Sequence, residues 1–518
     1  MTTGKTRHAF GVGVLGWPLL VLLVLSPLPA SATLIFVKAE ATGAGDGTSW
    51  ADAFPSLRTG LSVAQFGDEV WVAAGTYRPA KASRTTGFPI KPGVILRGGF
   101  AGSETALGER DLAAAGRETI LSGDLNGDDG PDFANYGENS YHVLQSTSVG
   151  FESTPGIIEG FVITGGNADS STMTMHRLGG GITVRAGGVI CRNCLFLNNK
   201  AESGGALSVR PNLIASHVEL IDCTLLANAA SGEGGAVSSP AGTLILTRCR
   251  LLGNSARGSG GGLANAGDAV LSNCLFSGNT ARLGAGAANL SSGMLTIRSS
   301  TLSGNAAEEL GGGLYHAGDG ASVVTSSILW GNTSSCGATA TQIDSDKDPV
   351  PIVRYSCVQG GWTAASGEAN IDADPAFLDG DGADDRLGTV DDNPRLWGYS
   401  PAIDAGDDAV PEEALDLDSN PRHFDAVATA DTGKGVAPVI DMGAFEYQGD
   451  CNGNGQPDAQ DIARGGSKDS DQDGIPDECV APPLRNLDCN SNGVIDSEDL
   501  WPSLVFTASQ SLDFASRP

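Results

Sequence analysis

A unit repeated six times between Gly179 and Asn332 constrains the fold more than any other feature of this chain. Each unit carries two adjacent small residues, then an apolar residue, and ends in an asparagine. The six asparagines are Asn199, Asn228, Asn254, Asn279, Asn305 and Asn332. Successive asparagines lie 29, 26, 25, 26 and 27 residues apart, a period typical of solenoids. We therefore expect stacked coils rather than a closed globular core.

Alternation of apolar and polar residues within each unit predicts short β-strands. Aligning the units on their asparagines gives three columns of inward residues. The column five residues earlier is Cys194, Cys223, Cys249, Cys274, Ser300 and Ser327. The column three residues earlier is Phe196, Leu225, Leu251, Phe276, Leu302 and Leu329. A preceding strand supplies Cys191, Leu220, Leu246, Leu271, Ile297 and Val324. Coils stacked about 4.8 Å apart also let the asparagine amides form a ladder at a tight turn.

The ten cysteines leave their pairing open. Parallel side chains in one column hold Cβ atoms about 4.8 Å apart, beyond the usual 3.5 to 4.5 Å of a disulfide. We favour a stack of buried thiols, with bridges between neighbouring coils as the alternative. Better bridge candidates are Cys336 with Cys357, and Cys451 with Cys479.

The two ends of the chain differ sharply in character. Residues 1–32 combine Lys5 and Arg7, an apolar run and an Ala30-Ser31-Ala32 cleavage site, which predicts a secretory signal peptide. No later stretch is long and apolar enough for a transmembrane anchor, so we expect a secreted or cell-surface protein. The net charge of -30 argues against nucleic-acid binding and favours cation uptake.

Several segments resemble known bacterial families. Residues 46–50 and 67–77 look like the opening of pectin-lyase-like β-helices. Residues 33–150 should form an N-terminal cap and the first coils, with a short helix in Phe54–Phe66 between strands at Leu34–Val37 and Glu69–Ala73.

Residues 151–370 should form the parallel β-helix repeats. Within them, four motifs are similar to the F-x-x-N and G-G-A repeats of polymorphic outer membrane proteins: Phe196–Asn199, Phe276–Asn279, Gly204–Leu207 and Gly234–Val237. This resemblance implies a right-handed parallel β-helix used as a surface adhesin.

Residues 371–448 resemble the choice-of-anchor module that closes many bacterial β-helix surface proteins. The resemblance rests on four motifs: Asp374–Phe377, Ser400–Gly406, Asp416–Arg422 and Asp441–Tyr447. It implies a final coil with a loop cap and no reaction. The expected fold class is therefore all-β, a right-handed parallel β-helix with a small C-terminal calcium-loop tail.

The tail, residues 449–518, carries the strongest chemical signal. Two twelve-residue segments place oxygen donors at positions 1, 3, 5, 9 and 12, a spacing that wraps ligands round one calcium ion. The donors of the first are Asp450, Asn452, Asn454, Asp458 and Asp461, with Gln456 giving a backbone carbonyl. Those of the second are Asp488, Asn490, Asn492, Asp496 and Asp499, with the carbonyl of Val494. The segments look like dockerin or EF-hand loops, which implies calcium and a cohesin-like partner.

Three further acidic segments are weaker calcium candidates. The segment between the two loops offers Asp469, Asp471, Asp473 and Asp477, but Val480 stands at position 12, and the pattern resembles a thrombospondin-type aspartate repeat. The segments 124–132 and 379–385 have carboxylates without a complete loop register. Calcium binding and a plain acidic turn remain equal alternatives for both.

Catalysis by a pectate lyase or glycosidase needs clustered or paired carboxylates on one face. The acids of the repeat fall at different coil positions, while Arg248, Arg250 and Arg298 are expected to be solvated. His217 and His316 have no evident catalytic partner, and we expect local contacts to satisfy each of them. We therefore expect a non-catalytic scaffold for adhesion or contact with a polysaccharide or cell-surface glycan. A polysaccharide lyase or glycoside hydrolase on the same scaffold is the alternative.

Overall fold

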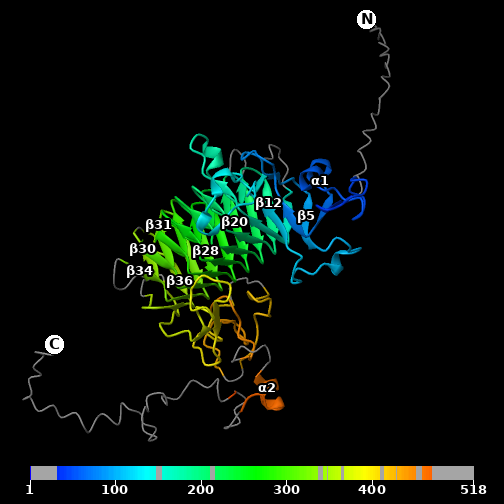
Figure 1. Cartoon of the computed structure of the whole chain (residues 1–518). Coiled ribbons are helices and arrows are strands. Elements are labelled where there is room, and N and C mark those ends of the chain that lie inside the picture. Colours follow the sequence, from blue (N-terminus) through cyan, green and yellow to red (C-terminus); the bar gives the residue numbers. More distant parts are fainter. Residues whose placement is uncertain are drawn as a thin grey trace, which may run out of the picture.

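The chain folds into a parallel β-helix, drawn as the stack of green and cyan coils in Figure 1. The computed structural model describes residues 1, 32–146, 154–210, 216–335, 342–346, 348–362, 367–408, 414–426, 429–450, 458–468 and 476. Four parallel sheets run along the stack, and each complete coil passes through sheets 1, 2, 3 and 4 in turn. The all-β parallel β-helix expected from the repeat is confirmed.

Sheet 1 is the longest of the four among the described residues. It comprises β1 (Leu34–Val37), β2 (Glu69–Ala73), β5 (Ile95–Phe100), β8 (Gly156–Glu159), β12 (Gly188–Arg192), β16 (His217–Ile221), β20 (Thr243–Thr247), β24 (Asp268–Ser272), β28 (Met294–Arg298), β32 (Ala321–Thr325) and β36 (Ile352–Arg354). Sheet 2 comprises β3 (Gly75–Tyr77), β6 (Thr119–Ser122), β9 (Phe161–Thr164), β13 (Leu195–Leu197), β17 (Thr224–Leu226), β21 (Arg250–Leu252), β25 (Leu275–Ser277), β29 (Thr301–Ser303), β33 (Ile328–Trp330) and β37 (Cys357–Val358).

Sheets 3 and 4 complete the coils. Sheet 3 comprises β10 (Asn167–Ala168), β14 (Lys200–Ala201), β18 (Ala229–Ala230), β22 (Ser255–Ala256), β26 (Thr280–Leu283), β30 (Ala306–Leu310) and β34 (Thr333–Ser334). Sheet 4 comprises β4 (Phe88–Pro89), β7 (Leu144–Ser146), β11 (Ile182–Val184), β15 (Leu207–Val209), β19 (Val237–Ser239), β23 (Leu263–Asn265), β27 (Ala287–Leu290), β31 (Leu314–Ala317) and β35 (Ile343–Ser345). The other elements are α1 (Leu57–Val63), α2 (Asp458–Arg464), 3₁₀ turns η1 (Leu107–Glu109), η2 (Pro131–Phe133), η3 (Tyr136–Glu138) and η4 (Thr174–His176), and an antiparallel hairpin of β38 (Phe377–Asp379) and β39 (Asn393–Leu396).

The strand register brings the predicted inward columns together. Cys191 pairs with Leu220, and Leu220 pairs with Leu246, in sheet 1. Phe196 pairs with Leu225 in sheet 2. These side chains are fully buried, and each aliphatic or aromatic side chain so buried contributes about 1.5 to 3 kcal/mol. The core is therefore a continuous apolar column along the axis.

The predicted asparagine ladder is present along the whole repeat. From Asn228 to Asn332, each side-chain Oδ1 accepts hydrogen bonds from the backbone N–H and the Nδ2 of the asparagine one coil earlier, at 2.8 to 3.1 Å. Asn199 Oδ1, at the start of the ladder, accepts the backbone N–H of Gly166 at 3.1 Å. Gln342 accepts from Asn332 Nδ2 at 2.6 Å and so continues the ladder by one coil. The amides are buried and mutually satisfied, which makes their role structural.

The cysteine column is a stack of free thiols, as favoured from its geometry. All six described cysteines are buried and unbridged. Cys194, Cys223, Cys249 and Cys274 each donate to the carbonyl two residues earlier, at 3.3 to 3.4 Å. Cys357 is free and donates to Ala373 O at 3.1 Å, whereas its suggested partner Cys336 lies outside the described residues. Cys451 and Cys479 lie outside the described residues.

The N-terminal end of the stack is covered by α1. Leu57 and Leu61 are buried in the main core together with Val37 of β1, the first strand of sheet 1. The helix is shorter than the predicted Phe54–Phe66, because Ala64 already has a ψ of 137°. Figure 1 shows α1 at this end, opposite β36. No helix among the described residues is long and apolar enough to cross a bilayer.

The segment 371–448, called the closing module below, packs against the side of the stack. Ile371, and Glu368 just before the module, extend the last coil by bridges to Cys357 and Arg354. The remainder lies on the outward face of sheet 2, where a cluster of Leu252, Leu275, Leu417, Ala444 and Phe445 is buried. The resemblance implied a final coil with a loop cap. The module also covers this face, where β21 and β25 each place one leucine outward.

Candidate functional site

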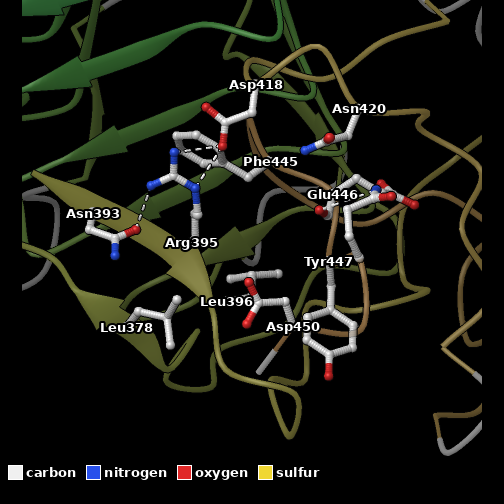
Figure 2. A pocket seen from close by; sticks show the side chains of 11 residues that line it. Leu378, Asn393, Arg395, Leu396, Asp418, Asn420, Phe445, Glu446, Tyr447 and Asp450 are labelled. Carbon is white, nitrogen blue, oxygen red and sulfur yellow. Dashed lines mark hydrogen bonds and ion pairs between the residues drawn. The ribbon is translucent and has the colours of Figure 1, made fainter. Parts of the chain in front are cut away.

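A cleft of about 390 Å³ opens where the closing module meets the start of the tail (Figure 2). The residues that line it are Leu378, Asn393, Arg395, Leu396, Asp418, Asn420, Phe445, Glu446, Tyr447, Gln448 and Asp450. The volume falls within the range of small-ligand sites. Amide, guanidinium, carboxylate and phenol groups surround a small apolar floor, a combination that suits a hydroxyl-rich ligand.

Three chain segments position these side chains. The strand β39 presents Asn393 and Arg395 on the same face, because they are two residues apart. A tight turn presents Asp418 and Asn420, since Asp416 Oδ1 accepts both of their backbone N–H groups at 2.9 and 2.7 Å. Tyr447 follows in the third segment, where its backbone N–H donates to a buried carboxylate.

Arg395 is the centre of the polar wall. Its Nε donates to Asp418 Oδ2 at 2.6 Å and its Nη1 to Asn393 Oδ1 at 2.7 Å, the dashed lines of Figure 2. Its guanidinium lies 4.8 Å from the centre of the Phe445 ring. Arg250, from β21, donates to Asp418 Oδ1 at 2.9 Å. Both oxygens of Asp418 are thus engaged by cations, which disfavours a role in proton transfer.

A buried polar network supports the cleft from behind. Arg422 is fully buried and donates to the carbonyls of Gly443 and Asp441 at 3.1 and 2.8 Å. Burial, followed by repulsion from Asp441, raises the pKa of Glu446 to about 10. Glu446 Oε2 accepts the backbone N–H of Asp441 at 3.0 Å. These groups are enclosed and hold the loops, so they are positioning residues.

The first predicted calcium loop begins at the rim of this cleft. Asp450 lines it, and Tyr447 donates its hydroxyl to Asp458 Oδ2 at 2.8 Å. Asp458 and Asp461, predicted donors 9 and 12, lie three residues apart in α2 and are both buried. They therefore share one face of the helix. Asp450 does not join them in any group of three described ligand atoms within 4.8 Å.

The remaining predicted calcium donors lie outside the described residues, and their binding stays a prediction. They are Asn452, Asn454, Gln456, Asp469, Asp471, Asp473, Asp477, Asp488, Asn490, Asn492, Val494, Asp496 and Asp499. The signal peptide, residues 1–32, lies outside as well except for its last residue and Met1.

Sequence reasoning missed the cleft because its residues are spread over 73 positions, from 378 to 450, and the motifs that contain some of them were assigned to a closing module rather than to a binding site. One signal was present: leucines occupy outward positions 252 and 275 of sheet 2, and both are buried. Arg250 and Arg248 were expected to be solvated, and this was wrong. Arg248 pairs with Asp222 of the preceding coil at 2.7 Å. Arg250 reaches the closing module, as described above.

Several histidine and charged side chains of the coils have polar partners. His217 contacts Glu219 at 2.6 Å, and His316 contacts Ser322 at 2.9 Å, so each histidine is satisfied by a residue near it in the sequence, as expected. Arg97 bridges Glu69 and Glu159 at 2.6 and 2.7 Å. Carboxylates held in such pairs are poorly suited to acid–base work.

Comparison with solved structures finds three similar chains, one of which is a pectate lyase. The crystal structure of pectate lyase Pel9A is similar with a TM-score of 0.44 and 14% identity, covering 81% of this chain and 97% of that chain. No family model matches the sequence, and no curated protein matches it.

Proposed function

We propose that this chain is an exported, non-catalytic β-helix scaffold that contacts a glycan at the cleft of the closing module. The observation that carries the proposal is the wall formed by Arg395, Asp418 and Asn393 beside the Tyr447 ring. Planar polar groups next to an aromatic ring can hydrogen-bond sugar hydroxyls and pack against the apolar face of a sugar. The stack of coils then serves as a rigid support.

Binding without turnover fits the charges of the cleft. A glycosidase needs two carboxyl groups, one of which exchanges a proton. Asp418 is held by two arginines, and Glu446 is only 4% exposed. A hydrolase or lyase that acts at another place on the coils is the alternative function.

The proposal also assigns calcium binding and attachment to the tail. Two calcium ions would order the loops at 450–461 and 488–499, and the first loop borders the cleft through Asp450. In this proposal calcium supports the cleft and the tail attaches the scaffold to a cell surface or to a cohesin-like partner. The net charge of -30 favours neutral glycans, or acidic glycans bridged by calcium.

The test is a binding and depolymerisation screen with the full mature chain. Neutral and acidic polysaccharides are immobilised, binding is measured with calcium and with EDTA, and the soluble products are assayed for new reducing or unsaturated ends. We expect retention of at least one polysaccharide without product. Turnover that is lost on mutating a carboxylate of the coils would establish the alternative.

Variants locate the contact. Tyr447→Ala removes the ring, and Gln448→Ala removes an amide from the rim. Each should weaken binding about tenfold, since one stacking or hydrogen-bonding group contributes about 1 to 1.5 kcal/mol. Gln65→Ala, an exposed glutamine at the other end of the stack, is the matched control and should bind normally.

A further inference from the structure

A second acidic site lies in the loop that joins β6 to β7. Asp124, Asp128, Asp129 and Glu138 each place a carboxylate oxygen within 4.8 Å of the others. Oxygens around one cation have this spacing. Asp124 is only 9% exposed, whereas Asp128 is exposed. The group thus has a closed side and an open side through which an ion can enter.

Lysine, arginine and histidine side chains of the described residues leave these carboxylates without a salt bridge. Among the described residues, none of the four forms an ion pair with lysine, arginine or histidine. The neighbouring Arg78 donates its Nε to the backbone carbonyl of Asp124, at 2.6 Å. Two like charges 4 Å apart repel by about 4 kcal/mol near a protein surface. Burial first, then repulsion from Asp124, Glu138 and Asp128, raises the pKa of Asp129 to about 6.

A second observation comes from Asn139, which is fully buried beside the group. Its Nδ2 donates to Asp129 Oδ2 at 2.8 Å and to Gly165 O at 2.7 Å, while its Oδ1 has no donor. Asp129 Oδ1 and Glu138 Oε1 are also buried without a donor. Each unsatisfied buried oxygen costs about 1 to 3 kcal/mol. These three oxygens, on Asp129, Glu138 and Asn139, indicate a place where a cation would bind.

We propose that this loop binds one calcium ion through Asp124, Asp128, Asp129 and Glu138. The carboxylates supply only hard oxygen ligands, and no histidine or cysteine belongs to the group, which favours calcium over zinc. The site is distinct from the tail and does not depend on the proposed glycan contact. It resolves the alternatives for segment 124–132 in favour of calcium, whereas segment 379–385 contributes no described group of this kind.

The calcium ion would stabilise a coil that lacks the strand pairing of sheet 3. Sheet 3 begins at β10, so the coil that contains β6 has no strand of sheet 3 among the described residues. The loop takes that place and reaches the next coil through Asn139 and Gly165. Bound calcium therefore fastens the first coils to the regular repeat.

Calcium titration of the full mature chain tests the site. The tail can bind calcium as well, so the readout is the difference between variants. The double variant Asp129→Asn/Glu138→Gln should bind one calcium ion fewer per chain than the wild type. Asp132→Asn, which removes one charge from the same loop but lies outside the group, should keep the wild-type number. Equal numbers in all three proteins, or an equal loss in Asp132→Asn, would overturn the proposal.

A second measurement covers the case in which the double variant does not fold. Asp128 is exposed, so Asp128→Asn should fold normally and weaken calcium binding at this site about tenfold. Terbium replaces calcium as a luminescent probe, with Tyr136, two residues before Glu138, as the sensitiser. Asp128→Asn should shift the sensitised emission to higher terbium concentration, and Tyr136→Phe should lower its amplitude. Unchanged emission in both variants would refute the site.

Discussion

Replacing Asp404 by asparagine should stabilise the closing module at alkaline pH. Asp404 is 1% exposed, so its carboxylate is shielded from water. Burial first, then repulsion from Asp441, Asp431 and Asp425, raises its pKa from 3.8 to about 7. Asparagine has almost the same shape without the charge. The change therefore removes an electrostatic cost without leaving a cavity.

The magnitude follows from proton linkage. Between pH 3.8 and about 7 the folded chain retains a proton on Asp404 that the unfolded chain releases, so the free energy of unfolding falls as pH rises through this window. At about 1.4 kcal/mol per pH unit the loss reaches about 4 kcal/mol above pH 7. Local relaxation and water entry reduce it to about 2 kcal/mol. Asp404→Asn should recover about 2 to 4 kcal/mol at pH 8 and less than about 1 kcal/mol at pH 4.5.

Urea unfolding at both pH values, in EDTA, measures this difference. The tryptophan fluorescence of the closing module, which contains Trp397, is the local signal. Asp385→Asn is the matched control, since this aspartate is exposed and its loss should leave the pH dependence unchanged. The reasoning is refuted when Asp404→Asn and the wild type lose stability in parallel between pH 4.5 and 8, or when the variant is the less stable protein at pH 8.

Three further substitutions test the scaffold. Asn254→Ala leaves the backbone N–H and Nδ2 of Asn228 without their acceptor, and should cost about 3 to 5 kcal/mol in urea unfolding. Leu275→Ala opens the buried contact with the closing module; a loss of about 2 to 4 kcal/mol should appear as faster limited proteolysis of that module. Cys249→Ser should cost under about 1.5 kcal/mol in thermal unfolding, because Ser300 in the same column donates to the equivalent carbonyl at 2.7 Å; a larger loss would contradict this.

The regular part of the fold could be predicted because one coil repeats the environment of the next. An inward Cys191 predicts an inward Leu220 once the period is known, and the register confirms the pairing. The ladder was predictable for the same reason, since amides stacked at strand spacing satisfy each other. Its continuation through Gln342 was not, because that residue lies 10 positions after Asn332 and breaks the period.

The candidate sites were harder to predict because they depend on contacts between segments far apart in sequence. Asp418 meets Arg250 across 168 residues, and no local pattern encodes that distance. Segment 124–132 showed three of the four acids of the proposed ion site, yet Glu138 and the buried Asn139 lie beyond it. The spacing of ligand residues within one segment identifies a metal site whose ligands all lie in that segment. It does not identify a site that residues of neighbouring turns complete.

The side-packed closing module changes how this solenoid should respond to force or heat. Coils that touch only their neighbours can open one at a time from an end. Here one module contacts β21, β25, β29 and β33, through Leu252, Leu275, Thr301 and Ile328. Detaching any of these four coils requires releasing the same module. They should therefore open as a single cooperative block, leaving the N-terminal coils as the first to fray.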